Sequence, residues 1–378
     1  MQTLLEPVAA TLVGDITRKK PPSGVVLAIA EGNHVHVSAA GVDDFSTGAE
    51  TTARHQQDIA SVSKILTTLA VLVLVGQGKI TLDSTVGTVF GRRAGHHAQA
   101  TVEDLLRHRA GFRQWWPLYL EPNAAEDPVG AALAVPPLDR PGHVRRYSDL
   151  GMQVLGGIVA GVTGQSFARA VHELVLEPLG ATTVLPGSPA PSCPVLAGPD
   201  GDAIERQMIR SNEPFPIGKN AASFRWRTAR IIREPADGNA FHVFRGAGGH
   251  AGWFADADGL LRVASALADP RLLGIDQMTA DQIATEVDAG QGLGVRRYTL
   301  TWHGRGRILL GHQGFTGTFV GAAPATTNDP ELRLALLANR LHGCPAPTRE
   351  LLVDVEALWT GALTAADKLL APLPRGER

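Results

Sequence analysis

Strand-like patterns at both ends of the chain, separated by a long helical middle, constrain the fold more than any other feature. Near the start, residues 24–30 (GVVLAIA) and 34–42 (HVHVSAAGV) are separated by Glu31-Gly32-Asn33, a pattern typical of a β-hairpin. Four further strand-like runs occupy residues 298–302, 307–311, 317–322 and 332–337. Because sequential strands and hairpins favour antiparallel pairing, we expect one antiparallel sheet assembled from both ends.

Helical patterns account for most of the remaining chain. An opening helix is predicted by apolar residues at helical spacing, namely Leu4, Leu5, Val8, Leu12 and Ile16. A closing helix is predicted from about residue 348 to 363. We therefore predict an α/β (α+β) fold in which residues 1–60 and 290–378 form a sheet region and residues 61–289 a mainly helical region, with an active site in the cleft between them.

Composition narrows the function classes. The chain has 378 residues, a formal net charge of −2 and 19% charged residues, without the basic excess that nucleic-acid or anionic-membrane binders carry. Its two cysteines, Cys193 and Cys344, exclude a disulfide framework and argue against structural zinc, and we predict no metal and no cofactor. The first residues lack a signal-peptide pattern, and the longest apolar run, 65–75, is too short to cross a bilayer. We expect a soluble, cytoplasmic protein; its oligomeric state stays open.

Ser61 and Lys64 are the first candidates for chemistry. They lie three residues apart at the start of a strongly apolar segment, so both side chains lie on one face of a buried helix. A serine needs a nearby base to become a nucleophile, and a lysine in a desolvated, electropositive site can lose its proton. Ser-x-x-Lys alone also occurs by chance about once in a chain of this length, so an ordinary buried helix start is the alternative.

A second candidate segment contains Tyr147 and Asp149. A phenol close to a lysine can relay a proton, which would give Tyr147 a catalytic role. Asp149 precedes a helical pattern of Val154, Leu155 and Ile158, so it could equally cap that helix. The segment alone does not decide between these interpretations.

A third candidate segment, 310–318, lies between two predicted strands and contains His312, Gly314 and Phe315. Glycines such as Gly314 and Gly317 would let a substrate approach the backbone closely. The alternative is a hairpin bend with a hydrogen-bonded surface histidine.

Taken in order, Ser61-x-x-Lys64, Tyr147-x-Asp149 and His312-x-Gly314 resemble the three motifs of the serine β-lactamase and penicillin-binding-protein superfamily. The chain is most similar to the class C β-lactamase-like branch, which includes family VIII esterases and D-stereospecific peptidases. The resemblance extends to residues 105–112, 176–180, 237–240 and 249–254 and covers about 22 to 340.

The resemblance implies an antiparallel sheet flanked by terminal helices and packed against a mainly helical domain. It also implies roles: Ser61 as the acylated nucleophile, Lys64 as its partner, and Tyr147 as the base that returns the proton to the leaving group. Backbone N–H groups of Ser61 and Phe315 would form the oxyanion hole, which contributes about 3 kcal/mol per donor in such sites.

Two departures from the motifs bear on the substrate. Asp149 replaces the usual Asn and, when ionised, can only accept hydrogen bonds, and His312 replaces the Lys of penicillin-recognising members. We therefore expect Asp149, His312, Gly314 and Phe315 to bind a small, neutral ester or amide in an esterase-like hydrolase. The alternatives are a β-lactamase, a D-Ala-D-Ala carboxypeptidase or D-aminopeptidase-type peptidase, and a non-catalytic penicillin-binding-like sensor.

Two remaining patterns have no assigned role. Trp115 and Trp116 are expected either to wall the acyl pocket or to pack as ordinary loop aromatics. The basic run 225–233 is interpreted as a solvated face or a rim of the cleft.

Overall fold

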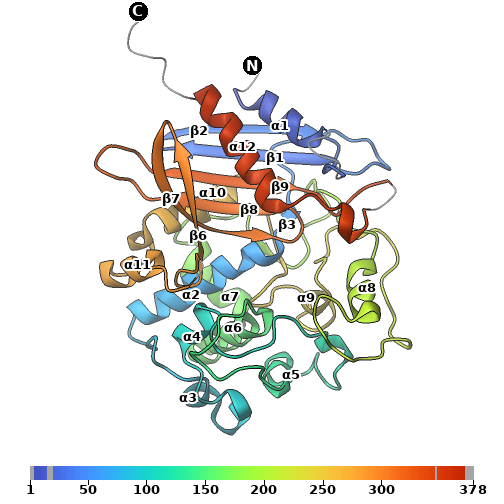
Figure 1. Ribbon diagram of the computed structural model, residues 1–378, viewed down its shortest axis with the longest axis vertical. Helices are drawn as coiled ribbons and strands as arrows, with labels where there is room; N and C mark the ends of the chain where they lie inside the picture. Colours follow the sequence, from blue (N-terminus) through green and yellow to red (C-terminus); the bar gives the residue numbers. More distant parts are fainter. Residues whose placement is uncertain (1–3, 15–19, 289, 345–346, 371–378) are drawn as a thin grey trace, which may run out of the picture.

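A six-stranded antiparallel sheet joins the two ends of the chain (Figure 1). The computed structural model describes residues 4–14, 20–288, 290–344 and 347–370. In spatial order the strands are β2 (His34–Gly41), β1 (Gly24–Glu31), β9 (Leu332–Ala338), β8 (Thr318–Ala323), β7 (Arg305–Gly314) and β6 (Arg296–Trp302). The predicted hairpin and the four C-terminal strands are confirmed, and the pairing of β1 with β9 connects the two ends.

The continuous apolar run of β1 reflects burial on both faces of the sheet. Val25, Leu27 and Ile29 contribute to one hydrophobic cluster, and the alternate residues Val26 and Ala28 to another. Successive side chains of a strand point to opposite faces, so β1 belongs to both layers. The residues of β1 therefore form an uninterrupted apolar run and do not alternate between apolar and polar side chains.

The terminal helices α1 (Glu6–Val13) and α12 (Val355–Leu370) cover one face of the sheet (Figure 1). Trp359 of α12 stacks on Phe319 of β8, with ring centroids 4.4 Å apart. The opening helix is confirmed over residues 6–13, whereas Ile16 lies outside the described residues.

The predicted start of the closing helix, near residue 348, is wrong. Residues Arg349–Leu351 form a 3-10 turn, and Leu352 is extended. The backbone there pairs with Lys20, whose N–H donates to the carbonyl of Leu351 at 3.0 Å. Because this pairing holds the segment extended, the helix begins only at Val355.

The opposite face of the sheet is covered by α10 (Ala257–Ala268), which contacts β1, β8 and β9. Below it, the buried helix α2 (Ser63–Gly76) packs against α6 (Asp149–Thr163). The other helices and short turns are α3 (Val86–Phe90), α4 (Val102–Leu106), α5 (Pro128–Ala134), α7 (Phe167–Val171), α8 (Ala203–Ser211), α9 (Gly238–His242) and α11 (Gln277–Ala284), with the helical turns Ala60–Val62, Gly91–His97, Leu118–Leu120, His172–Leu176 and Pro270–Leu273. A small sheet joins β3 (Gln57–Asp58), β5 (Trp253–Ala255) and β4 (Leu185–Pro186).

Over the described ranges, no single helix is both long and apolar enough to cross a membrane. The segments 149–163 and 167–176 reach that length only as a pair, across a bend of 80°.

Candidate active site

Ser61 lies in the 3-10 turn Ala60–Val62 that leads directly into α2. The turn begins with a strained residue, because Ala60 has a φ of 43°, a left-handed conformation that alanine rarely adopts. The carboxylate of Asp58 stabilises it: Oδ1 accepts from the Ala60 N–H at 2.9 Å and Oδ2 from the Ala236 N–H at 2.7 Å. Burial of this carboxyl raises the pKa of Asp58 to about 6.

The same segment is attached to the sheet from the other side. Thr316 Oγ1 donates to the carbonyl of Asp58 at 2.7 Å, and Thr318 Oγ1 donates to the carbonyl of Ile59 at 3.0 Å. Both threonines belong to the end of the β7–β8 hairpin, so the hairpin and the turn that carries Ser61 hold a fixed relative position.

Lys64 is almost fully buried, and three oxygen atoms surround its Nζ. Nζ donates to Ser61 Oγ at 2.8 Å and to the carbonyl of His250 at 3.0 Å, and it lies 2.7 Å from Asp149 Oδ1. Burial alone would lower the pKa of Lys64, but Asp149 and Tyr147 together raise it above the ordinary value. Lys64 is therefore an ammonium ion that orients the Ser61 hydroxyl, and the geometry does not support a neutral lysine base.

Asp149 reaches Lys64 because α6 begins beside α2. The helix is capped by Ser148, whose Oγ accepts from the Gly151 N–H at 3.1 Å and donates to the carbonyl of Arg113 at 2.6 Å. Asp149 is the first residue of α6 and leaves its carboxylate free for the ion pair with Lys64. The interpretation of Asp149 as the helix cap is wrong.

Tyr147 lies between the Ser61–Lys64 pair and two histidines. Its ring centroid is 4.8 Å from that of His108 and 5.8 Å from that of His312, and Lys64 Nζ lies 5.0 Å from it. Lys64 and Ser61 both act to lower the pKa of the phenol. Burial raises the pKa of Tyr147 above its ordinary value, although Lys64 acts in the opposite direction, so the phenol keeps its proton at neutral pH.

His312 lies near the end of β7 and is neutral. Burial, reinforced by the charge of Lys64, lowers the pKa of His312 to about 3. Its Nδ1 donates to the carbonyl of Gln313 at 2.7 Å, which leaves Nε2 as an acceptor that has no partner among the described residues. His312 therefore supplies no positive charge to the site.

Packing requires a glycine at position 314. A Cβ at this position would lie 2.1 Å from Thr318 Oγ1 and 2.4 Å from the carbonyl oxygen of Ile59. The side of Gly314 on which a Cβ would lie is therefore filled by Thr318 and by the segment that precedes Ser61, while the residue also lines the second cavity.

Phe315 follows in the turn between β7 and β8, with 45% of the residue exposed. Arg340 fixes it: Nε donates to the Phe315 carbonyl at 2.7 Å, and the guanidinium lies 5.0 Å from the centre of its ring. The backbone of Phe315 is thereby held beside the Ser61 turn.

Two cavities meet at the residues Ser61, Tyr147 and Phe315. The first is mainly apolar, and its walls include Trp115, Met208 and Phe215. The second lies toward β6 and β7, and its lining includes His312 and three arginines.

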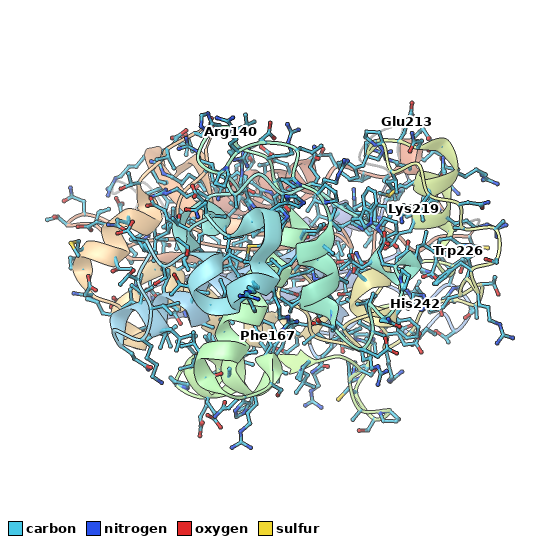
Figure 2. The ribbon with its side chains drawn as sticks, turned by 90° about the horizontal axis from the view of Figure 1, so that it is seen from below. Arg140, Phe167, Glu213, Lys219, Trp226 and His242 are labelled. Atoms are coloured by element: carbon cyan, nitrogen blue, oxygen red, sulfur yellow. The ribbon has the colours of Figure 1, made fainter. Side chains whose placement is uncertain are left out.

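The outer part of the first cavity is built from the segment around α8, and Figure 2 shows Glu213, Lys219, Trp226 and His242 gathered on one side of the molecule. Trp115 faces the first cavity and also packs with Ile209 and Ile217. Arg227 pairs with Asp202 at 2.6 Å, and Arg230 with Asp44 at 2.6 Å, so these two residues of the basic run are held in ion pairs.

A family model described as Beta-lactamase matches residues 12–357. The chain belongs to the beta-lactamase family. Its relatives include the esterase EstB of Burkholderia gladioli, 30% identical over 68% of this chain and 68% of the esterase. They also include the N-acetylmuramyl-L-alanine amidase of Bacillus subtilis (strain 168), 27% identical over 85% of this chain and 78% of the amidase.

The fold has matching solved structures. The D-amino acid amidase from Ochrobactrum anthropi SV3, complexed with D-phenylalanine, aligns with a TM-score of 0.70 at 20% identity, over 97% of this chain and 98% of the amidase. These similarities confirm the superfamily and the fold predicted from the three motifs, and the family makes this chain a serine hydrolase.

Sequence reasoning missed several residues of this beta-lactamase-family site. His108 packs on Tyr147, and its Nδ1 accepts from the Ser148 N–H at 3.3 Å, which positions the Tyr147–Asp149 turn. His250 supplies the carbonyl for Lys64, while its Nε2 lies 3.0 Å from Asp237 Oδ1. Both histidines lie in segments that contributed to the resemblance, but spacing alone gave them no role.

The described part of the chain contains no group of three or more His, Cys, Asp or Glu side chains placed to hold a metal ion. The thiols of Cys193 and Cys344 are free.

Proposed function

We propose that this serine hydrolase cleaves small carboxylic esters or amides through an acyl-enzyme on Ser61. The observation that carries the proposal is the 2.8 Å contact between Ser61 Oγ and the buried Lys64 ammonium, beside Tyr147 and at the junction of two cavities. A serine in such a position is oriented, desolvated on one side and open to substrate on the other.

Tyr147 then acts as a proton relay. Its oxygen accepts the Ser61 proton as Oγ attacks the substrate carbonyl, while its own proton passes to the departing alcohol or amine. The proton from Ser61 thus replaces the one that Tyr147 gives to the leaving group, so the phenol ends neutral and no tyrosinate is needed. Water replaces the leaving group in the second half, and the same transfers in reverse release the acid and restore Ser61.

Charge on the carbonyl oxygen would be stabilised by the backbone N–H groups of Ser61 and Phe315. The strained Ala60 and the Arg340–Phe315 contact support this proposal, because they fix the two backbones before substrate arrives. Preorganised donors of this kind contribute about 3 kcal/mol each.

Other activities of relatives are the competing candidates. Among the relatives, one is named a D-aminopeptidase from Brucella anthropi and another penicillin-binding protein 4 from Amycolatopsis lactamdurans. We favour esters and simple amides because the relative EstB is an esterase and because His312, in place of the motif lysine, is uncharged. A cytoplasmic location stays a prediction.

The test uses an active-site fluorophosphonate and three substrates: short p-nitrophenyl esters, a chromogenic cephalosporin and a D-Ala-D-Ala peptide. We expect labelling and ester hydrolysis in the wild type and neither in Ser61→Ala. The matched control is Ser63→Ala, a buried serine whose Oγ has no partner in the described structure. Absence of labelling in the wild type would support the sensor alternative, and fast cephalosporin turnover without esterase activity would support a β-lactamase.

A further inference from the structure

One wall of the first cavity comes from a segment that the proposed chemistry does not use. Ile204 and Met208 of α8, and Phe215 beyond its end, line this cavity together with Ser61. Figure 1 shows α8 at the edge of the molecule. The segment lies in none of the stretches on which the family resemblance was based, so the motifs give it no role.

Helix α8 presents an apolar surface to the cavity because its apolar residues follow helical spacing. Ile204 and Met208 are four residues apart and lie on one face, where both line the cavity. The buried Ile209 packs with Trp115 and Ile217 and attaches the helix to the rest of the chain. Arg206 and Arg210 are exposed, so the charged side of α8 faces solvent.

Glu205 is a second attachment of α8. Its Oε1 accepts from the Gly238 N–H at 2.7 Å, and Tyr119 Oη donates to its Oε2 at 2.6 Å. The contact is closely packed, since a Cβ at Gly238 would lie 2.4 Å from Glu205 Oε2 and 2.8 Å from Tyr119 Cε1. Burial raises the pKa of Glu205 to about 8, and the charge of Asp237 acts in the same direction, so Glu205 is neutral at pH 7.

The other acidic residues of this cavity have partners within the protein. Each of three carboxylates is paired or hydrogen-bonded: Asp149 with Lys64 at 2.7 Å, Asp202 with Arg227 at 2.6 Å, and Asp237 with His250 at 3.0 Å. With Glu205 protonated, the cavity therefore offers a ligand mainly apolar surface.

The position of Tyr147 decides which half of the substrate meets this surface. In the proposed mechanism Tyr147 gives its proton to the leaving group, and its ring lies 5.8 Å from that of His312, which lines the second cavity. The leaving group therefore departs on the side of the second cavity. The acyl group, which stays on Ser61, extends into the first cavity.

We propose that Met208 and Phe215 are specificity-determining residues, through which the enzyme selects substrates with an uncharged, apolar acyl chain of several carbons. Glu205 is a positioning residue, because it joins α8 to Tyr119 and Gly238. An aliphatic chain gains by leaving water for such a wall, and the flexible thioether of methionine adapts to its shape. This inference rests on the proposed acyl transfer from Ser61 and deepens it by naming the acyl group.

Two pairs of esters test the assignment. Ethyl acetate and ethyl hexanoate differ only in the acyl chain, whereas ethyl acetate and hexyl acetate differ only in the alcohol. The readouts are an acyl ratio and an alcohol ratio, the kcat/KM of the longer ester divided by that of ethyl acetate, so that a general loss of activity cancels. One buried methylene contributes about fourfold, and we expect an acyl ratio of at least about ten in the wild type.

Variants assign the acyl ratio to residues. We expect Met208→Trp, which fills the cavity, and Met208→Gln and Phe215→Gln, which make its wall polar, each to reduce the acyl ratio by at least about threefold. The matched control is Met278→Gln, a change at an exposed methionine of α11, which should keep the wild-type ratio. Variants at Met208 and Phe215 that change the alcohol ratio and leave the acyl ratio unchanged would overturn the assignment.

The pH dependence of the acyl ratio tests Glu205. The titratable and charged groups around it are Tyr119, Asp202, Arg227, Asp237, His242 and His250. Ionised Glu205 would keep water in the cavity wall, so the wild-type acyl ratio should fall between pH 7 and pH 9. Glu205→Gln stays neutral and can still bond to Tyr119 and Gly238, so its ratio should stay constant. A constant ratio in the wild type, or equal falls in both proteins, would overturn the role of Glu205.

Binding is measured separately, so that the result does not depend on turnover. In Ser61→Ala, titration calorimetry compares acetamide with hexanamide, and tighter binding of hexanamide supports the inference. An acyl ratio of one or below in the wild type, together with no preference for hexanamide, overturns the inference and leaves the hydrolase proposal intact. Absence of ester hydrolysis and of fluorophosphonate labelling in the wild type, with the preference for hexanamide retained, instead overturns the hydrolase proposal.

Discussion

Lys64 Nζ lies 2.7 Å from Asp149 Oδ1, at the junction of two buried helices. This ion pair favours the protonated form of Lys64. It keeps the lysine protonated beside the nucleophile, while Asp149 also lines the first cavity. In the proposed mechanism the proton of Ser61 therefore passes to Tyr147 and not to Lys64.

Asp149→Asn tests the ion pair. Without the carboxylate, burial dominates and the pKa of Lys64 falls, so the ammonium is lost at a lower pH. We expect the alkaline limb of kcat/KM for a p-nitrophenyl ester to move down by at least about one pH unit. The control is Asp258→Asn, which removes an exposed carboxylate paired with Arg262. An unchanged alkaline limb in Asp149→Asn would show that Lys64 does not depend on this partner.

Tyr147→Phe tests the relay. Phenylalanine keeps the ring between His108 and His312 but removes the oxygen that carries the proton. We expect ester turnover to fall by two or more orders of magnitude, with a small change in melting temperature. A kcat/KM within about threefold of the wild type would exclude Tyr147 as the proton carrier.

Gly314→Ala tests the coupling between the β7–β8 hairpin and the Ser61 turn. The added methyl overlaps Thr318 Oγ1 and the Ile59 carbonyl, so the segment before Ser61 has to move. We expect a loss of about 1–3 kcal/mol in the free energy of unfolding, together with at least about tenfold slower fluorophosphonate labelling. Gly306→Ala is the matched control, because that glycine of β7 has open space around its Cβ position. Equal labelling rates in the two variants would contradict the coupling.

His312→Gln tests the neutral histidine through the pH dependence of stability. The folded-state pKa of His312, about 3, lies below the ordinary 6.5, so the unfolded chain binds the extra proton as the pH falls below 6.5. Stability that is present above pH 6.5 is therefore lost on acidification, by about 2 kcal/mol between pH 7 and 5 for this residue alone.

Urea unfolding at pH 7 and pH 5 measures this effect. The wild type should lose about 2 kcal/mol more than His312→Gln over this interval, whereas His34→Gln, a change at an exposed strand residue, should follow the wild type. Parallel losses in the wild type and His312→Gln would show that His312 is not buried in its neutral form.

Much of the architecture was predictable because it depends on local pattern. The hairpin of β1 and β2 and the four C-terminal strands follow from alternating or continuous apolar runs and turn residues. The contact between Ser61 and Lys64 follows from a spacing of three residues at a helix start. The start of α12 was misjudged because the pairing of Leu351 with Lys20 joins segments more than 300 residues apart.

The charged contacts of the site were less predictable, because they too join residues that are far apart in the sequence. The partner of Lys64 is 85 residues away in the sequence, and Arg145, in the segment before α6, lines the same cavity as Arg296 at the start of β6. Each residue has an ordinary local explanation, as a helix start or a strand position. Only the folded chain shows that Asp149 forms an ion pair with Lys64. It also shows that two arginines line the cavity next to the uncharged His312.

The central claim, covalent acyl transfer through Ser61, is tested most directly by trapping the intermediate. The enzyme is mixed with a p-nitrophenyl ester, quenched in acid during turnover, digested and analysed by mass spectrometry. The account predicts an acyl group on Ser61, within the peptide that also contains Lys64, and no adduct in Ser61→Ala. Rapid ester hydrolysis with the acyl group on another residue, or with activity retained in Ser61→Ala, would contradict it.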